Sequence, residues 1–393
     1  MKIAQIHNRY KDIGGEDIVV EREKNLLQDA GHEVVQYFVS NNDIISTKEK
    51  IHTSIHLSYS LKYKKKVISF LKKETPDVVH VHNFLPILSP SVFYATKQLN
   101  IPVVLTLHNF RLLCINGLLY RNNKTCENCV SKKIPLDGIK YGCYQNSKVI
   151  SLFPTISNSL HTFMKTWQSK INKVIFLSEF SKGVFSRSHI SFKPEQMSVK
   201  PNFLEDKGYS YEKQNYFLYV GRISEEKGIL TVLESFIASG KLLKIAGTGP
   251  LQDEVIAYSK THKNIVYLGF QNQQQLKDLY LNAKATVFAS KMYEGLGLVV
   301  IESFSFGTPV IGPEFGNSGQ LITENYNGNK YELGNATSLS EVIRSFEENQ
   351  NQKSLRKNAR TTFEEKFTAQ KNLQTLEKIY KESIESSRDL TSI

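Results

Sequence analysis

The chain has 393 residues and a formal net charge of +12, and 40% of its residues are hydrophobic. Because domains usually hold about 100–200 residues, this length predicts two domains. The hydrophobic content excludes a disordered or fibrous protein. The longest apolar runs, at residues 101–107 and 296–301, are far shorter than the roughly 18–20 residues that cross a bilayer. The N-terminus shows no signal-peptide pattern, so we expect a cytoplasmic protein.

The positive charge indicates an anionic partner, such as nucleic acid, phospholipid or a phosphorylated metabolite. Eight lysines lie between residues 48 and 73, against the single acid Glu49, and apolar residues are interspersed among them. If this segment is helical, it resembles a basic amphipathic surface suited to the anionic inner face of a membrane. The alternative is an ordinary helix with solvated lysines and an apolar face on the core.

The first half alternates short apolar strands with amphipathic helices, which is typical of α/β domains with mostly parallel sheets. A strand at residues 2–7 precedes a Gly14-Gly15 loop and a helix over residues 17–30, which Gly31 ends. Further strands are predicted at residues 34–38, 78–82 and 103–108. The last two end in histidine, and we expect His80 and His82 to face opposite sides of their strand, with His80 in the core.

The second half repeats the pattern and predicts a second α/β domain. Its predicted strands cover residues 216–220, 242–246, 265–268, 285–289 and, as the last one, 310–311. The boundary is expected near residues 200–202, with a polar linker to residue 215. A helical segment covers residues 354–387, with a break near 367–368. The predicted organisation is therefore an N-terminal domain at 1–200, a C-terminal domain at 201–366 and a last helix at 367–393.

Charged residues follow the first strand of the second half. In open parallel sheets, ligands collect beyond the carboxyl ends of the strands. Arg222 follows that strand directly, and Lys227 precedes a helix. Two cations beside helix N-terminal amides suit a diphosphate, although two solvated surface cations would give the same pattern.

A second motif covers residues 293–311 and carries two carboxylates. Glu294 lies in the loop before a helix, and Glu302 follows eight residues later, in the helix itself. Gly295 and Gly297 leave backbone N–H groups open to an anion. This arrangement suits a nucleotide-sugar, with phosphates in the middle and a hydroxyl-rich ring at either end.

These motifs together resemble the retaining glycosyltransferases of family 4, which have the GT-B fold. The motifs, in chain order, are Gly-Arg-x4-Lys-Gly, Gly-Thr-Gly-Pro and Glu-x7-Glu followed by Gly-Thr-Pro-Val. The resemblance implies two Rossmann-like parallel-sheet domains that face a central cleft, with a C-terminal helix that crosses back to the first domain. The first domain would bind the acceptor and the second the nucleotide-sugar donor.

The resemblance also implies roles for single residues. Arg222 and Lys227 match the pair on the donor diphosphate, Glu302 the carboxylate on the ribose, and Glu294 the one on the sugar hydroxyls. The donor site would further include backbone or loop positions at Gly15, Gly249, Gly295, Leu296, Gly297 and Leu298. His108 matches a histidine of the donor-sugar pocket, although Asn109 follows it where the family often has Asp. The predicted catalytic residues are therefore Glu294, His108, Arg222 and Lys227.

The expected reaction is transfer of a sugar from a nucleotide-sugar, expected to be a UDP-sugar, to an acceptor hydroxyl with retention. No Asp-x-Asp motif occurs in the sequence, so no catalytic metal or other cofactor is expected. The resemblance implies a saccharide or lipid-linked acceptor, in surface polysaccharide or glycolipid synthesis. The alternatives are a GT-B epimerase acting on a nucleotide-sugar and a basic nucleic-acid-binding protein.

The four cysteines lie within thirty residues of one another. They are Cys114, Cys126, Cys129 and Cys143. The Cys-x2-Cys pair has the spacing of a zinc knuckle, and the two flanking cysteines complete a four-thiolate set. A structural zinc site is therefore predicted between residues 114 and 143, with unpaired structural thiols as the alternative.

Overall fold

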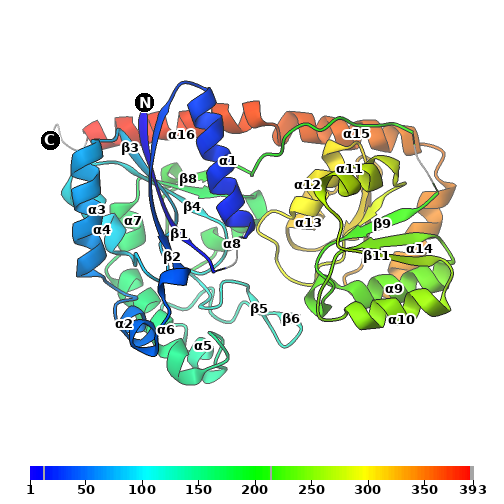
Figure 1. The fold of residues 1–393 in the computed structure, drawn as a ribbon, viewed down its shortest axis with the longest axis horizontal. Coiled ribbons are helices and arrows are strands. Elements are labelled where there is room, and N and C mark those ends of the chain that lie inside the picture. The colour runs from blue at the N-terminus through cyan, green and yellow to red at the C-terminus, as the bar shows by residue number, and fades with distance from the viewer. Residues whose placement is uncertain (12–13, 213–214, 390–393) are drawn as a thin grey trace. The chain divides into compact units, whose positions relative to one another are not determined.

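A computed structural model describes residues 1–11, 14–212 and 215–389, without the side chains of residues 388 and 389 (Figure 1). Residues 213–214 of the predicted linker and 390–393 of the predicted last helix lie outside this description. The chain forms two compact units. The first holds Met1–Leu119, Cys126–Asn202 and the segment from Asn372, and the second holds Tyr120–Thr125 and Phe203–Lys371.

The first unit is built on a six-stranded sheet in which every strand pair is parallel. In spatial order its strands are β2 (Glu33–Ser40), β1 (Lys2–Arg9), β3 (Val78–Asn83), β4 (Val103–Leu107), β7 (Lys173–Phe176) and β8 (Met197–Val199). β3 and β4 are buried along their whole length, as continuous β-branched runs require in a sheet covered on both faces. The sequence did not predict β7 and β8.

The helices of the first unit pack in part on its sheet and in part on one another (Figure 1). They are α1 (Gly15–Asp29), α2 (Thr47–Ile55), α3 (Leu61–Glu74), α4 (Ser91–Gln98), α5 (Leu136–Lys140), α6 (Lys148–Phe163), α7 (Thr166–Lys170), α8 (Glu179–Ser186) and α16 (Ala369–Asp389), with 3₁₀ turns at Asn41–Asp43 and Pro194–Gln196. From α16, Leu376, Ile379 and Tyr380 enter a core cluster that includes Ile3 and Leu27. This packing confirms the predicted return of the C-terminal helix to the first domain.

The lysine-rich segment forms two helices, α2 and α3. Val67 and Leu71 of α3 are buried against the core, while lysines such as Lys65 and Lys66 are exposed. α3 thus has the arrangement of an ordinary core-packed helix with a solvated cationic face. No helix in the described part of the chain is long and apolar enough to span a membrane.

An ion pair between Lys200 and Glu23 lies inside the first unit, and both side chains are only 1% exposed. Lys200 also donates to Asn372 Oδ1 (3.3 Å), just ahead of the α16 residues in the core. Burial alone would raise the pKa of Glu23, but attraction and a hydrogen bond from Lys200 oppose burial, and the net effect lowers the pKa. Since the folded pKa is lowered, this stabilisation is present above the ordinary carboxyl pKa and is lost as the pH falls through the lowered value.

The second unit is built on another six-stranded parallel sheet. In spatial order its strands are β11 (Ile265–Gly269), β10 (Leu243–Ala246), β9 (Phe217–Val220), β12 (Thr286–Val287), β13 (Val310–Pro313) and β14 (Gly328–Tyr331). Its helices are α9 (Ile229–Ser239), α10 (Gln252–Thr261), α11 (Gln273–Asn282), α12 (Leu298–Ser305), α13 (Gly316–Leu321), α14 (Ala336–Glu348) and α15 (Gln352–Lys366), with a 3₁₀ turn at Glu225–Lys227 and a short antiparallel hairpin of β5 (Tyr120–Arg121) and β6 (Lys124–Thr125).

The prediction that residues 310–311 form the last strand is wrong, because β14 pairs beside β13. Its sequence Gly-Asn-Lys-Tyr has low strand propensity and gave no signal. A Cβ on Gly328 would lie 2.0 Å from the Val310 carbonyl oxygen, so the strands approach closely only because this residue is glycine.

No disulfide joins the four cysteines in the described part of the chain, and Cys114 and Cys129 are buried. Burial, with a smaller contribution from the neighbouring Cys114, raises the pKa of the Cys129 thiol to about 12. Four thiols suit Zn²⁺ chemically. Among the described residues, however, no three of the four sulfur atoms lie within 4.8 Å of one another, so their geometry adds no support to the zinc prediction.

Replacement of Lys200 by Met is expected to lower the free energy of unfolding by about 3–5 kcal/mol, because the Glu23 carboxylate stays buried without its partner. The double variant Lys200→Met/Glu23→Gln should lower the free energy of unfolding by much less, because it leaves no unpaired buried carboxylate. As a control, Arg9→Ala breaks a half-exposed pair with Glu21 and should cost no more than ~1 kcal/mol. Urea unfolding followed by fluorescence measures this, because Trp167 is the sole tryptophan and is buried in the first unit. Equal losses in the single and double variants would contradict this role.

If the cysteines bind zinc, purified protein should contain about one zinc per chain, and Cys129→Ser should lower the zinc content. A strong chelator should lower the melting temperature, because a structural metal contributes directly to folding. Elemental analysis and thermal unfolding measure these effects. Zinc-free protein whose melting temperature the chelator leaves unchanged would refute the site.

Candidate active site

Three loops of the second unit meet at the carboxyl ends of neighbouring strands. Between the loops after β9 and β10, the Ile223 N–H donates to the Thr248 carbonyl (2.9 Å), and the Leu251 N–H donates to the Ile223 carbonyl (3.0 Å). A Cβ on Gly249 would lie 2.3 Å from the Ile223 carbonyl oxygen. A Cβ on Gly228 would lie 2.1 Å from the carbonyl oxygen of Ala289, in the loop after β12. Glycine at these positions therefore lets the loops pack backbone to backbone.

Two of the predicted catalytic residues pair with each other at this edge. Lys227 Nζ forms an ion pair with Glu294 Oε1, and Ser290 Oγ donates a hydrogen bond to the same oxygen (2.8 Å). The side chains of Lys227 and Glu294 are 28% and 21% exposed, so a ligand can reach both. Sequence reasoning predicted both residues but assigned them to different parts of a ligand, and it missed their contact with each other and with Ser290.

Arg222 follows β9 directly, and its side chain is exposed. Its backbone carbonyl accepts a hydrogen bond from Tyr219 Oη (3.2 Å), which fixes the start of the loop. The described contacts do not join the Arg222 guanidinium to Lys227 or Glu294. The exposed guanidinium fits the diphosphate prediction and the solvated-cation alternative equally.

Helix α12 begins at Leu298, directly after Gly297, which has φ +75° and is the N-cap. The preceding Leu296 is buried, and its carbonyl accepts a hydrogen bond from Asn317 Nδ2 (2.5 Å), which fixes the loop after Gly295. In α12, Glu302 Oε2 accepts from Tyr280 Oη (3.1 Å). The N-terminus of α12 thus follows closely after Glu294. Its unpaired backbone N–H groups can bind an anion there.

Tyr280 was not predicted. Burial and the adjacent Glu302 raise its pKa far above the ordinary value for a tyrosine, so the phenol keeps its proton and donates to the carboxylate. Tyr280 comes from α11, where it matches the apolar face of an amphipathic helix. Sequence periodicity therefore gives no sign of its contact with Glu302. Ser290 could have been found as a polar residue just beyond a strand end.

In the first unit, His80 and His82 lie on the same side of β3, with ring centroids 4.0 Å apart. The expectation that they face opposite sides is wrong, because side chains two residues apart on a strand share one face. His80 hydrogen-bonds Tyr380 Oη (2.8 Å) and Thr106 Oγ1 (2.7 Å), which confirms it as a core residue.

His108 follows β4 and contacts His82, with 3.2 Å between His108 Nε2 and His82 Nδ1. Burial, only partly offset by attraction to Glu23, lowers the pKa of His108 to about 3. His108 is therefore neutral near pH 7, and it can donate or accept a hydrogen bond but cannot supply a cationic acid.

Glu23, His80 and His82 form the one group of three or more metal-ligating side chains found in the described part of the chain. Glu23 already pairs with Lys200, and both ring nitrogens of His80 are hydrogen-bonded. The group is therefore a structural network.

Gly15 is the first residue of α1, with Gly14 as its N-cap. The Gly14 N–H donates to Asp17 Oδ2 (2.9 Å), and the other carboxylate oxygen of Asp17 lies 2.9 Å from His7 Nε2. Asp17 thus fixes the start of α1. Gly15 and His108 belong to the first unit, and the other predicted donor-site residues to the second.

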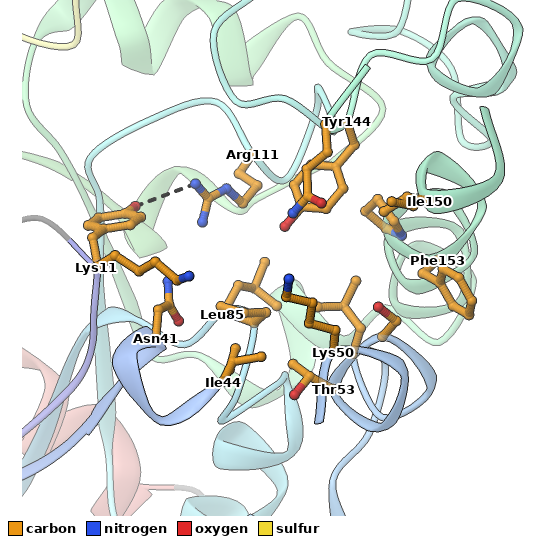
Figure 2. Close-up of a pocket in the computed structure, with 16 residues that line it drawn as sticks. Lys11, Asn41, Ile44, Lys50, Thr53, Leu85, Arg111, Tyr144, Ile150 and Phe153 are labelled. Carbon is orange, nitrogen blue, oxygen red and sulfur yellow. Dashed lines mark hydrogen bonds between the residues drawn. The ribbon is translucent and has the colours of Figure 1, made fainter. Parts of the chain in front are cut away.

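The first unit also contains a cavity of about 530 Å³ (Figure 2). Lys11, Lys50 and Arg111 line it, and their cationic groups point into the same space. An apolar wall includes Ile44, Leu85, Ile150 and Phe153. No carboxylate occurs among the described residues that line the cavity, so its chemistry suits an anion with an apolar part.

Arg111 is held at the cavity wall by hydrogen bonds. Its Nη2 donates to Tyr10 Oη (3.4 Å, dashed in Figure 2), which donates to Glu16 Oε2 (3.0 Å). Burial raises the pKa of Glu16 to about 7, although Arg111 opposes the rise. Arg111 Nε is buried and has no hydrogen-bond partner among the described residues. Sequence reasoning did not identify this cavity.

Comparison with known proteins finds two family models along the chain. Glycosyltransferase Family 4 matches residues 13–206, and Glycosyl transferases group 1 matches residues 202–362. An uncharacterized glycosyltransferase of Methanocaldococcus jannaschii is 25% identical over 67% of this chain and 64% of its own length. The N-acetyl-alpha-D-glucosaminyl L-malate synthase of Bacillus anthracis is 21% identical over 94% of each chain.

The fold has a solved counterpart in the crystal structure of Anabaena HepE in complex with UDP. The TM-score is 0.65, with 15% identity, 96% coverage of this chain and 99% of that one. The two family models together extend over residues 13–362 and thus include both parallel-sheet units. The chain is a glycosyltransferase that belongs to family 4 and has the GT-B fold.

Proposed function

We propose that this glycosyltransferase moves a sugar from a UDP-sugar to a hydroxyl group of an anionic acceptor, with retention and without a catalytic metal, in the synthesis of surface polysaccharide or glycolipid. The observation that carries this proposal is the pairing of Lys227 with Glu294 beside the N-terminus of α12. The Lys227 cation and the helix N-terminus would suit the diphosphate of a nucleotide-sugar, and the Glu294 carboxylate would suit the hydroxyl groups of its sugar.

The donor would bind in the second unit. Arg222 and Lys227 would contact the diphosphate, together with the N-terminal amides of α12. Glu302, held by Tyr280, would accept from the ribose hydroxyls, and Glu294 from the sugar hydroxyls. Before the donor binds, the ion pair would hold the Lys227 and Glu294 side chains in place. When a diphosphate attracts Lys227, the Glu294 carboxylate would become free to accept hydrogen bonds from the sugar. The UDP complex of HepE supports this nucleotide.

In the proposed reaction, the bond between the anomeric carbon and the leaving phosphate oxygen breaks while the acceptor oxygen bonds to the same face of that carbon. The acceptor proton passes to the leaving phosphate. Arg222 and Lys227 would stabilise the charge that develops on the diphosphate. Both are cations already present in the chain, and the sequence has no Asp-x-Asp motif, which supports a metal-independent step.

From the first unit, Gly15 would contribute its backbone at the N-terminus of α1 to the diphosphate, and His108 would hydrogen-bond the donor sugar. The low pKa of His108 supports a hydrogen-bonding role over acid catalysis. A neutral imidazole also fits a reaction in which the leaving phosphate takes the proton.

The acceptor would bind in the cavity beside Lys50 and Arg111. Its three cations favour an anionic group, and its apolar wall favours a lipid or ring beside that group. The relative from Bacillus anthracis has L-malate, an anion, in its name, which supports an anionic acceptor. A separate acceptor cavity favours a transferase over an epimerase, because an epimerase uses no acceptor.

Arg222→Ala and Glu294→Ala are each expected to lower kcat/KM for sugar transfer by about 10²–10³, because each removes a group that contacts the transition state. Arg222→Ala should also weaken UDP binding, whereas Glu294→Ala should leave it nearly unchanged, because the carboxylate faces the sugar. Glu341→Ala, an exposed change on α14, is the control. The donor is first identified by a thermal-shift screen of UDP-sugars. Unchanged transfer in both variants would refute the assignment.

Lys50→Gln and Arg111→Gln are expected to weaken binding of farnesyl phosphate, an anionic apolar probe, by roughly 10- to 100-fold, because each removes a charge-assisted contact. Lys48→Gln should have no effect, because Lys48 lies on the same helix but outside the cavity lining. Farnesol, which lacks the phosphate, should bind weakly to all four proteins. Titration calorimetry measures these affinities. Equal binding of probe and alcohol by the unsubstituted protein would contradict an anionic acceptor site.

A further inference from the structure

We propose that helix α6 and the adjoining helix α2 form a surface that docks on an anionic lipid bilayer. The polarity of α6 is the reverse of that of an ordinary surface helix. Its buried side carries mostly polar residues, namely Ser151, Pro154, Thr155, Ser157, Asn158, His161 and Thr162. Its outer face, defined here as Val149, Leu152, Ile156, Leu160 and Phe163, is apolar, and each of these side chains is 40–67% exposed.

Hydrogen bonds on the buried side fix this orientation. Asn158 Nδ2 donates to the Arg111 carbonyl (2.9 Å). The two ring nitrogens of His161 hydrogen-bond the Ser58 carbonyl (2.8 Å) and Thr166 Oγ1 (2.9 Å), and burial lowers the pKa of this histidine, so it stays neutral. Rotation of α6 to bury its apolar face would break these bonds and leave the carbonyls of Arg111 and Ser58 without these donors, which costs about 1–3 kcal/mol for each group that finds no other partner. The apolar face is therefore held outward.

The exposed apolar side chains of the chain concentrate in this region. Of the 18 large hydrophobic side chains exposed in the described part, 12 lie within residues 45–55 and 134–164. They include Ile51 and Ile55 of α2 and Leu136 of α5, and both helices pack against α6. Isolated exposed apolar residues need no explanation, but a contiguous patch indicates an interaction surface.

The charge around the patch favours an anionic bilayer over other occupants. Residues 130–173 contain seven lysines and one acid, Asp137, which is paired with Lys132. Lys148 and Lys165 lie exposed at the two ends of α6, and α6 itself contains no carboxylate. Apolar side chains at the lipid boundary with lysines on the lipid phosphates match an interfacial helix. A second copy of this basic chain would instead bring lysines against lysines.

The cavity of Figure 2 lies between the same two helices, since α2 supplies Lys50 and Thr53 and α6 supplies Ile150 and Phe153 to its lining. A bilayer on the outer face of α6 would therefore lie against a helix that also lines the cavity. This step rests on the proposed function: a lipid-linked acceptor could place its anionic head group in the cavity while its lipid stays in the bilayer.

The test is co-sedimentation of the full chain with phosphatidylglycerol vesicles and with phosphatidylcholine vesicles. The unsubstituted protein should bind the anionic vesicles at least about tenfold more tightly than the neutral ones. Ile156→Glu should weaken this binding roughly tenfold or more, because it removes one apolar side chain from the lipid boundary and adds a carboxylate that the anionic lipids repel. Phe270→Glu, an equally drastic change at a 75%-exposed residue of the second unit, is the matched control and should bind as the unsubstituted protein does.

Circular dichroism and UDP binding, both expected to be unchanged in Ile156→Glu, show that the variant is folded. Absence of vesicle binding by the unsubstituted protein, or equal binding by Ile156→Glu, would overturn the proposal. Dimerisation in size-exclusion chromatography that Ile156→Glu abolishes, without vesicle binding, would assign the surface to a second copy and also overturn it. Vesicle binding needs no donor, so failure of the proposed transfer reaction is detected separately, by the UDP and transfer assays.

Discussion

The parallel direction of every strand in each six-stranded sheet is the constraint on which the candidate site depends. Parallel strands bring all their carboxyl ends to one edge, so loops far apart in the sequence become neighbours there. In the second unit, the loops after β9, β10 and β12 contact one another through glycine backbones. Lys227 and Glu294, 67 residues apart, pair as a result.

In the first unit, a buried charge organises the residues behind the equivalent edge. Lys200 neutralises Glu23, and β3 adds His80 and His82 beside the carboxylate. Because burial keeps these imidazoles neutral, the group holds one positive and one negative charge. His108 contacts His82 and is buried beside this group, and burial keeps it neutral. Its role as a hydrogen-bonding group therefore depends on the fold of the whole unit.

The sequence was informative where local chemistry decides the structure. Strands with β-branched runs, the glycines after them and the break between α15 and α16 were predicted, because propensity and backbone conformation act within a few residues. β14 was missed, since pairing with β13 overrides its low propensity. Tyr280, Ser290 and the cavity were missed because their contacts join residues distant in the chain. The reversed face of α6 was missed as well, since periodicity identifies an apolar stripe but not the side on which it lies.

The return of α16 to the first unit has a consequence for biosynthesis. The core of the first unit needs Leu376, Ile379 and Tyr380, whereas nearly all of the second unit comes from the continuous stretch Phe203–Lys371. On the ribosome, the second unit can therefore complete its core while the first still lacks a helix. Until residues 372–380 have left the exit tunnel, the nascent first unit lacks the α16 side chains that pack with Ile3 and Leu27, and such incompletely covered apolar surface is prone to aggregation.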